Sequence, residues 1–289
     1  MEKLIINAAL TGMVPTKAQN GAVPISPAEI IADARRCRDA GASIVHIHAR
    51  EVDETPSYRK EIYREIISGI RDACPELLVC GSTSGRTFKE FAQRAEVLNA
   101  GPGCRPDLAS LTLGSLNFPN QASVNEPQMI QSLAEVMRCA GIVPELELFD
   151  LGMADYARYL ISKNILAPAF YANILLGSLG TLSAAPENLV AVVRALPEGT
   201  IWSATGIGRF QFQVNCLAIA MGGHVRVGLE DSLYYDAGKT RLATNAGLVE
   251  RLVRVAESME REIASCQETR AALGIGHPQL VSAPTRLAA

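Results

Sequence analysis

Strand and helix patterns alternate eight times along the 289 residues, and this alternation limits the possible folds more than any other feature of the sequence. Short apolar runs predict strands at 4–11, 43–49, 77–82, 108–114, 143–149, 170–176, 200–206 and 224–230. Longer amphipathic runs predict helices at 27–40, 58–73, 88–100, 127–140, 153–163, 186–195, 211–221 and 242–263. Eight strand-then-helix units are typical of a (β/α)8 TIM barrel, an α/β fold around a closed parallel sheet. No composition shift interrupts the pattern, so we expect one barrel domain over residues 1–273 and a C-terminal tail over residues 274–289.

Composition excludes several classes of protein. The formal net charge is −3 and no cluster of Lys and Arg stands out, so nucleic acid is not an expected partner. No uncharged apolar run reaches about 18 residues, and the N-terminus opens on a strand pattern, so neither a membrane span nor a targeting segment is expected. The seven cysteines are scattered and include no C-x-x-C pair, which favours reduced thiols and a cytoplasmic location.

Two of the four histidines, His46 and His48, lie at the end of the second predicted strand. Side chains alternate faces along a strand, so both imidazoles point the same way, roughly 7 Å apart. A hydrogen-bonded pair of core histidines would explain them without any function. Because catalytic groups of such barrels lie at the carboxyl ends of the strands, and neutral imidazole is a common metal ligand, half of a metal site is the alternative that we favour.

Charged residues are also expected inside the barrel. In the eighth predicted strand Arg226 and Glu230 lie opposite Val225, Val227 and Leu229, and in the fifth Glu145 and Glu147 alternate with leucines. Interior charges are costly without partners. They form either a structural Arg–Glu network or part of an active site.

His46, His48 and Glu230 are the best candidate metal ligands, because the eighth strand of a barrel closes against the first, which adjoins the second. Two histidines and one carboxylate leave coordination positions open for a substrate oxygen. Zinc fits this set, although cobalt, manganese or iron would also bind it. Asp231 follows Glu230 and, paired with Arg226, is the candidate proton acceptor.

Polar turns supply candidate donors for substrate oxygens. Ser82, Thr83, Ser84 and Gly85 follow the third predicted strand, and Thr112 ends the fourth. Arg209, after the seventh strand, lies where barrels of this type often hold phosphate. An H-x-H pair also occurs in metal-dependent amidohydrolases, but there it lies on the first strand, and here only His224 and His277 remain for further ligands.

Seven motifs together resemble the β-keto acid cleavage enzymes over about residues 4 to 260. They are Asn7-Ala8-Ala9-Leu10-Thr11-Gly12, Val45-His46-Ile47-His48-Ala49-Arg50, Ser82-Thr83-Ser84-Gly85, Leu113-Gly114-Ser115-Leu116-Asn117-Phe118, Pro144-Glu145-Leu146-Glu147, Gly206-Ile207-Gly208-Arg209 and residues 222–231, which end in Gly228-Leu229-Glu230-Asp231.

The resemblance implies a zinc-dependent TIM barrel that converts a β-keto acid and acetyl-CoA into acetoacetate and a new acyl-CoA. It implies that Arg226 and Asp231 deprotonate acetyl-CoA, and that Glu145 is a carboxylate of the catalytic site. Ser82 and Ser110 would hold oxygens of the substrate or intermediate. It also implies a homo-oligomer, either a dimer or a homotetramer.

One position departs from the family member that acts on 3-keto-5-aminohexanoate. There a glutamate after the first strand pairs with the amino group of the substrate, and the matching position here is Val14. Without that carboxylate a cationic amine would be poorly compensated in a desolvated pocket. We therefore expect an uncharged or apolar β-keto acid rather than the aminated one.

Two other functions are compatible with the same residues. A class II metal aldolase would cleave its substrate without CoA, so dependence on acetyl-CoA separates the two enzymes. A non-catalytic barrel that binds a metabolite would have no need for interior charges such as Arg226 and Asp231.

Overall fold

The computed structural model describes residues 2–101 and 103–276. Eight parallel strands close into a barrel in the order β1-β12-β11-β10-β9-β6-β5-β2. They are β1 (Ile6–Ala9), β2 (Ile44–Ile47), β5 (Leu78–Gly81), β6 (Leu108–Thr112), β9 (Val143–Leu148), β10 (Tyr171–Leu176), β11 (Ile201–Gly206) and β12 (His224–Val227). The predicted TIM barrel is therefore confirmed.

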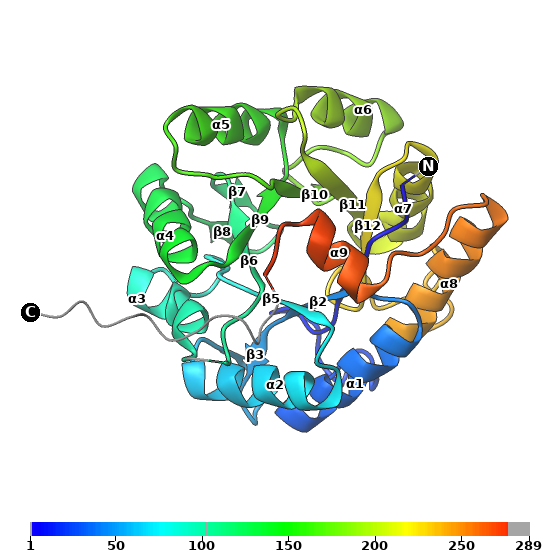
Figure 1. The fold of residues 1–289 in the computed structure, drawn as a ribbon. Coiled ribbons are helices and arrows are strands. Elements are labelled where there is room, and N and C mark those ends of the chain that lie inside the picture. The colour runs from blue at the N-terminus through cyan, green and yellow to red at the C-terminus, as the bar shows by residue number, and fades with distance from the viewer. Residues whose placement is uncertain (1, 102, 277–289) are drawn as a thin grey trace, which may run out of the picture.

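Helices surround this barrel (Figure 1). They are α1 (Pro27–Asp39), α2 (Lys60–Ala73), α3 (Phe91–Arg94), α4 (Pro127–Ala140), α5 (Leu151–Ser162), α6 (Pro186–Ala195), α7 (Gln211–Ala220) and α8 (Asn245–Ser258). The α1 helix begins as the sequence predicts, with Ser26 and Glu29 forming a capping box ahead of the helix interior. Among the described residues, no helix combines the length and the apolar character that a membrane span requires.

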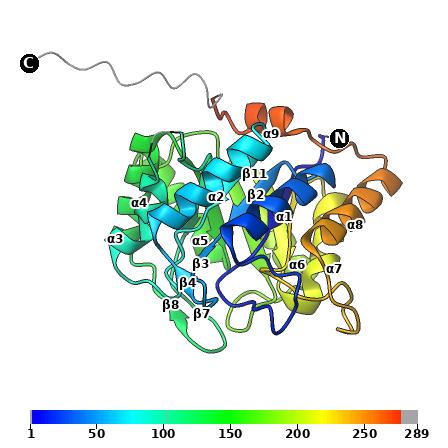
Figure 2. The same ribbon diagram turned by 90° about the horizontal axis from the view of Figure 1, so that it is seen from below.

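The two ends of the barrel are built differently (Figure 2). Helix α9 (Cys266–Ala272), which the sequence patterns did not predict, covers the end where the strands begin. Its Thr269 bonds Ser43 at 2.8 Å, and its Arg270 pairs with Asp107 at 2.9 Å. At the opposite end lie the hairpins β3 (Ala49–Arg50) with β4 (Pro56–Ser57), and β7 (Leu116–Asn117) with β8 (Ala122–Ser123).

The predicted helix at 88–100 is wrong. It is a single turn, α3, followed by the 3-10 helix η1 (Glu96–Asn99). Arg94 turns inward, where its side chain donates to the carbonyls of Thr83 and Val124 and to Asn125 Oδ1. These distant partners fix the segment against the loops after β5 and β8, and they override its helical periodicity.

The predicted strand at 224–230 is also too long. β12 ends at Val227, because the Gly228 carbonyl accepts hydrogen bonds from the amides of Asp231 and Ser232 and so closes a turn. A Cβ at Gly228 would lie 2.0 Å from the Ala9 carbonyl oxygen, so only glycine allows this approach. Glu230 consequently reaches the site from a turn and not from the face of a strand.

The helix predicted at 242–263 is shorter at both ends, since Thr244 caps α8 and the helix ends at Ser258. The proposed tail begins at Gly274, and its residues 277–289 lie outside the described part of the chain. The division into 1–273 and 274–289 therefore stays a prediction.

Candidate active site

Three side chains converge as a possible metal site at the carboxyl end of the barrel. The Nε2 atoms of His46 and His48 lie 3.2 Å apart, and Glu230 Oε1 lies 3.3 Å from His48 Nε2. Glu230 Oε2, 3.7 Å from His46 Nε2, is buried and lacks a hydrogen-bond partner. Ligands of a tetrahedral zinc ion are roughly 3.3 Å apart, given metal–ligand bonds of about 2.0–2.1 Å. The spacing and the unsatisfied oxygen together fit a divalent transition metal.

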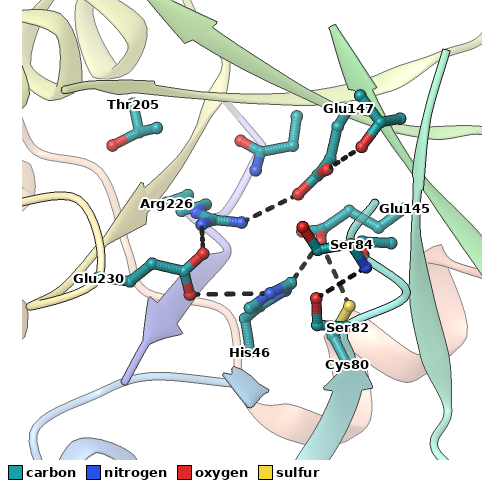
Figure 3. A network of polar contacts seen from close by, with 12 residues as sticks. His46, Cys80, Ser82, Ser84, Glu145, Glu147, Thr205, Arg226 and Glu230 are labelled. Atoms are coloured by element: carbon teal, nitrogen blue, oxygen red, sulfur yellow. Dashed lines mark hydrogen bonds and ion pairs between the residues drawn. The ribbon is translucent and has the colours of Figure 1, made fainter. Parts of the chain in front are cut away.

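His46 is oriented from behind by Glu145. The imidazole Nδ1 lies 3.1 Å from Glu145 Oε2, and Glu145 also accepts a hydrogen bond from the Cys80 thiol at 3.3 Å (Figure 3). A third hydrogen bond to Glu145 comes from Asn7 Nδ2 at 2.7 Å. Burial alone would raise the pKa of Glu145, but the hydrogen bonds from His46 and Cys80 and the charges of His46 and Arg226 together hold that pKa below its usual value. A carboxylate behind a ligating histidine fixes the ring and its tautomer.

Arg226 joins the carboxylates of the site. Its guanidinium lies 2.9 Å from Asp231 Oδ2, 2.7 Å from Glu230 Oε1 and 3.4 Å from Glu147 Oε1. Burial disfavours the charged guanidinium, but the charges of Asp231, Glu230, Glu145 and Glu147 together raise the pKa of Arg226 well above its usual value. The inward face that the sequence predicts for Arg226 is therefore the observed one.

The carboxylates next to Arg226 differ in proton affinity. Burial raises the pKa of Asp231 above its usual value, although Arg226 acts in the opposite direction. For Glu230 burial acts the same way, but Arg226 and the two histidines together hold its pKa well below the usual range. The low proton affinity of Glu230 suits a metal ligand, and the higher proton affinity of Asp231 suits a proton acceptor.

A cavity of about 380 Å³ opens over this cluster. Eight of the residues singled out from the sequence line it: Val14, His48, Ser82, Ser84, Thr112, Arg226, Glu230 and Asp231. Val14 is about half exposed. Thr112 donates to Glu147 at 2.6 Å, so this hydroxyl and the strand β9 carboxylate form one wall.

Five other candidates lie behind that lining. His46 and Glu145 belong to the layer below the cavity, as described above. Thr83 and Ser110 bond each other, through Thr83 N–H to Ser110 Oγ at 3.1 Å and Thr83 Oγ1 to the Ser110 carbonyl at 2.6 Å. Gly85 packs so tightly that an added Cβ would lie 2.7 Å from the Arg94 guanidinium. For Thr83, Ser110 and Gly85, the contacts in this structure serve loop packing, and their predicted contact with substrate remains a prediction.

Several polar and aromatic residues of the cavity are not among the candidates from the sequence, and four of them matter for its chemistry: Glu147, Arg86, Phe118 and Ser178. Glu147 was expected to face inward, but without a role, and its alternation with Glu145 was the available signal. Arg86, Phe118 and Ser178 lie on loops and carry no periodic signal that would have placed them in the cavity.

Comparisons with known proteins identify the family of this chain. The family model described as beta-keto acid cleavage enzyme matches residues 3–275. A 3-keto-5-aminohexanoate cleavage enzyme of Fusobacterium nucleatum is 40% identical over 276 residues, which cover 95% of this chain and 99% of the relative. A 3-oxoadipate:acetyl-CoA acetyltransferase of Cupriavidus necator is 34% identical over 274 residues, which cover 94% of each chain.

A solved structure, the apo form of ObcA, superposes with a TM-score of 0.78 at 20% identity, and the match covers 88% of this chain and 66% of that one. At this identity the likeness concerns the fold alone. The family model and the curated relatives, which span nearly the whole chain, show that this protein belongs to the β-keto acid cleavage enzyme family.

Proposed function

We propose that this enzyme transfers the acyl part of a β-keto acid to CoA, with acetyl-CoA as the second substrate and acetoacetate as the other product. The observation that carries the proposal is the Arg226–Asp231 pair, which lines the cavity within one residue of the candidate ligand Glu230. The names of the relatives support the reaction class, since two of those described above are cleavage or acetyl-CoA-dependent enzymes of keto acids.

The chain's own residues account for the proton and charge transfers. Asp231 accepts a proton from the methylene group of the β-keto acid, because burial raises its proton affinity and Arg226 holds its carboxylate in place. The resemblance implied the methyl group of acetyl-CoA instead, but acetoacetate forms only if the methylene carbon attacks the thioester carbonyl carbon. Arg226 also compensates the negative charge that the resulting carbon nucleophile carries. Ser82 and Ser84 line the cavity and offer hydroxyl donors to substrate oxygens. When bound by His46, His48 and Glu230, a divalent metal supplies Lewis-acid polarisation of a keto oxygen.

Over the whole reaction, the bond between the keto carbon and the methylene carbon of the β-keto acid breaks, as does the thioester bond of acetyl-CoA. A carbon–carbon bond and a new thioester form in their place. No oxidant or reductant is needed, and the proton taken by Asp231 is returned when acetoacetate forms.

Zinc, a homo-oligomeric assembly and a cytoplasmic location complete the proposal. The two-histidine, one-carboxylate donor set supports zinc. The cysteines of the described chain are free thiols, which supports a reducing compartment. A dimer or tetramer rests on the family resemblance alone, and ultracentrifugation of the purified chain tests it.

The apolar side chain of Val14 at the cavity mouth supports our proposal that a cationic β-keto acid is not the preferred substrate. A steady-state panel tests this point. If the aminated acid had the highest kcat/KM, the inference from Val14 would be wrong.

The reaction class is tested by measuring acetoacetate from a panel of β-keto acids, each with and without acetyl-CoA. We expect acetoacetate only when both substrates are present. Cleavage of the acid without acetyl-CoA would instead indicate the metal aldolase, and ligand binding without turnover would indicate the metabolite-binding barrel.

A further inference from the structure

Arg86 presents a cation to the cavity that the proposed reaction does not use. Its guanidinium carbon lies 3.4 Å from the centre of the Phe118 ring, and Phe118 in turn meets Phe149 edge to face. Within the described chain, no carboxylate lies within 4.0 Å of Arg86 and its guanidinium donates no hydrogen bond. Stacking on an aromatic face holds the planar donor fork in a fixed orientation.

The other cavity arginine is already neutralised. Arg226 is bonded or paired to three carboxylates, so few of its donors remain for a substrate. Arg86 is close enough to Glu230, Glu147 and Asp231 for their charges to raise its pKa, although burial outweighs them and lowers that pKa overall. A half-buried guanidinium without an acceptor is costly, and an anionic ligand relieves that cost.

Two carboxylates of a substrate are candidates for this fork. The carboxylate common to all β-keto acids is one methylene from the keto carbon, so it must lie close to the reacting centre at His48, Glu230 and Asp231. Arg86 stacks instead on Phe118, beside the hairpin of β7 and β8, and forms no ion pair with Glu230 or Asp231. Its position therefore favours a second anionic group, farther along the acyl part.

We propose that Arg86 is a specificity-determining residue that binds a terminal carboxylate of the acyl part, and that the preferred substrate is a dicarboxylic β-keto acid. This inference rests on the proposed function and names the substrate class for that same site. The proposal keeps one half of the expectation drawn from Val14, that an aminated acid is disfavoured, and replaces the other half, because the acyl part would carry a negative charge instead of being uncharged or apolar.

The test uses two acids with the same six-carbon chain. 3-Oxoadipate ends in a carboxylate, whereas 3-oxohexanoate ends in a methyl group. The ratio of their kcat/KM values with acetyl-CoA isolates the terminal group. We expect the wild-type enzyme to prefer 3-oxoadipate, and Arg86→Met to lower kcat/KM for that acid by roughly 10- to 100-fold, with little change for 3-oxohexanoate. Arg86→Lys should restore part of the preference, because it keeps the charge but not the fork.

Arg209→Met is the matched control. Arg209 also stacks on a phenylalanine, Phe210, at 4.8 Å, but it lies outside this cavity. We expect the ratio for the two acids to be unchanged in this variant.

Three outcomes would overturn the assignment of Arg86. An equal loss for both acids in Arg86→Met would place the common carboxylate on Arg86. A raised KM for acetyl-CoA alone would place a CoA phosphate there, and no change at all would leave only the stacking on Phe118. If the wild-type enzyme formed no acetoacetate from either acid, the proposed function would fail first. Calorimetric binding of adipate to wild type and Arg86→Met would then test the anion site by itself, and equal affinities would contradict it.

Discussion

Two arginines are among the largest fully buried side chains of the described chain, Arg226 and Arg261, and their partners differ in kind. Arg261 donates only to backbone carbonyls: those of Glu2 at 2.8 Å, Gly223 at 2.6 Å, Gly222 at 3.1 Å and Ile219 at 3.3 Å. Arg226 is surrounded by three carboxylates, from β9 and the turn after β12.

This difference in partners separates an arginine with a structural role, Arg261, from one at the candidate active site, Arg226. Backbone carbonyls neither titrate nor move, so Arg261 holds the chain start and the α7–β12 connection together at the closed end of the barrel. Carboxylates accept protons and bind metals, so Arg226 lies among groups whose state changes during a reaction. Burial is the same for both, and it is the partners and the barrel end that identify the function.

The largest expected effect is a loss of activity when Asp231, a partner of Arg226, is replaced. Asp231→Asn keeps the size of the side chain and an acceptor for Arg226, but it removes the base. We expect kcat to fall by roughly 10²- to 10⁴-fold, with an almost unchanged thermal midpoint, because burial already disfavours the charged carboxylate. Steady-state kinetics and thermal unfolding measure the two effects. If the variant lost activity only because it was less stable, the Arg226–Asp231 pair would have a structural role, as Arg261 has.

Arg261→Met tests the opposite end. It leaves buried carbonyls without donors, so we expect a loss of roughly 2–4 kcal/mol in the free energy of unfolding. The KM values and kcat of the folded protein should stay as in the wild type. Denaturant unfolding together with kinetics at low temperature makes the measurement. A change in kcat without a loss of stability would contradict the structural assignment.

The histidines show the same division into structural and active-site residues. His224 is on the structural side and makes the free energy of unfolding depend on pH. Its Nδ1 accepts the Ile5 amide at 3.0 Å at the start of β12, and burial lowers its pKa to about 4. The folded pKa lies below the unfolded value of about 6.5, so the stabilisation is complete above pH 6.5 and is lost as the pH falls toward 4. We expect this group to contribute about 3 kcal/mol to that loss of stability.

His224→Asn keeps an acceptor that does not protonate. Its unfolding free energy should therefore depend less on pH between about 6.5 and 4 than that of the wild type. If the unfolding free energies of the two proteins had the same pH dependence, His224 would not be the titrating group.

The smallest expected effect is on metal affinity, and it concerns Glu145, which lies behind the candidate ligand His46. Glu145→Gln weakens the acceptor of His46 without changing its size, so we expect metal affinity to fall by roughly 10- to 100-fold. Glu147→Gln, two residues along β9, is the control, because Glu147 contacts Thr112 and Arg226 but not His46. Metal titrations of both variants decide the point, and equal affinities would remove Glu145 from its positioning role.

The sequence predicted the barrel because each strand–helix unit carries its own periodicity, a local property. For the same reason it predicted that His46, His48 and Arg226 point inward. It failed where distant contacts decide the backbone. β12 stops at Val227 because Gly228 meets Ala9, and the segment at 88–100 is broken because Arg94 binds the loops around it.

The alternation of side chains along a strand also does not predict how deep in the barrel a residue lies. Glu145 and Glu147 share one face of β9, yet only Glu147 lines the cavity, while Glu145 lies a layer below, behind His46. Arg86 was missed for a related reason. Its place in the cavity depends on Phe118, which the chain brings to it from a hairpin about thirty residues later.

The central claim is that His46, His48 and Glu230 hold a metal ion, and that the enzyme needs this ion for turnover. The most direct measurement strips the protein of metal, returns zinc in steps and follows acetoacetate formation. We predict that stripped protein is inactive, that activity rises until one ion is bound per chain, and that a variant with His46→Ala and His48→Ala neither binds the ion nor regains activity. Full turnover by stripped protein, or recovery of the double variant with zinc, would contradict the claim.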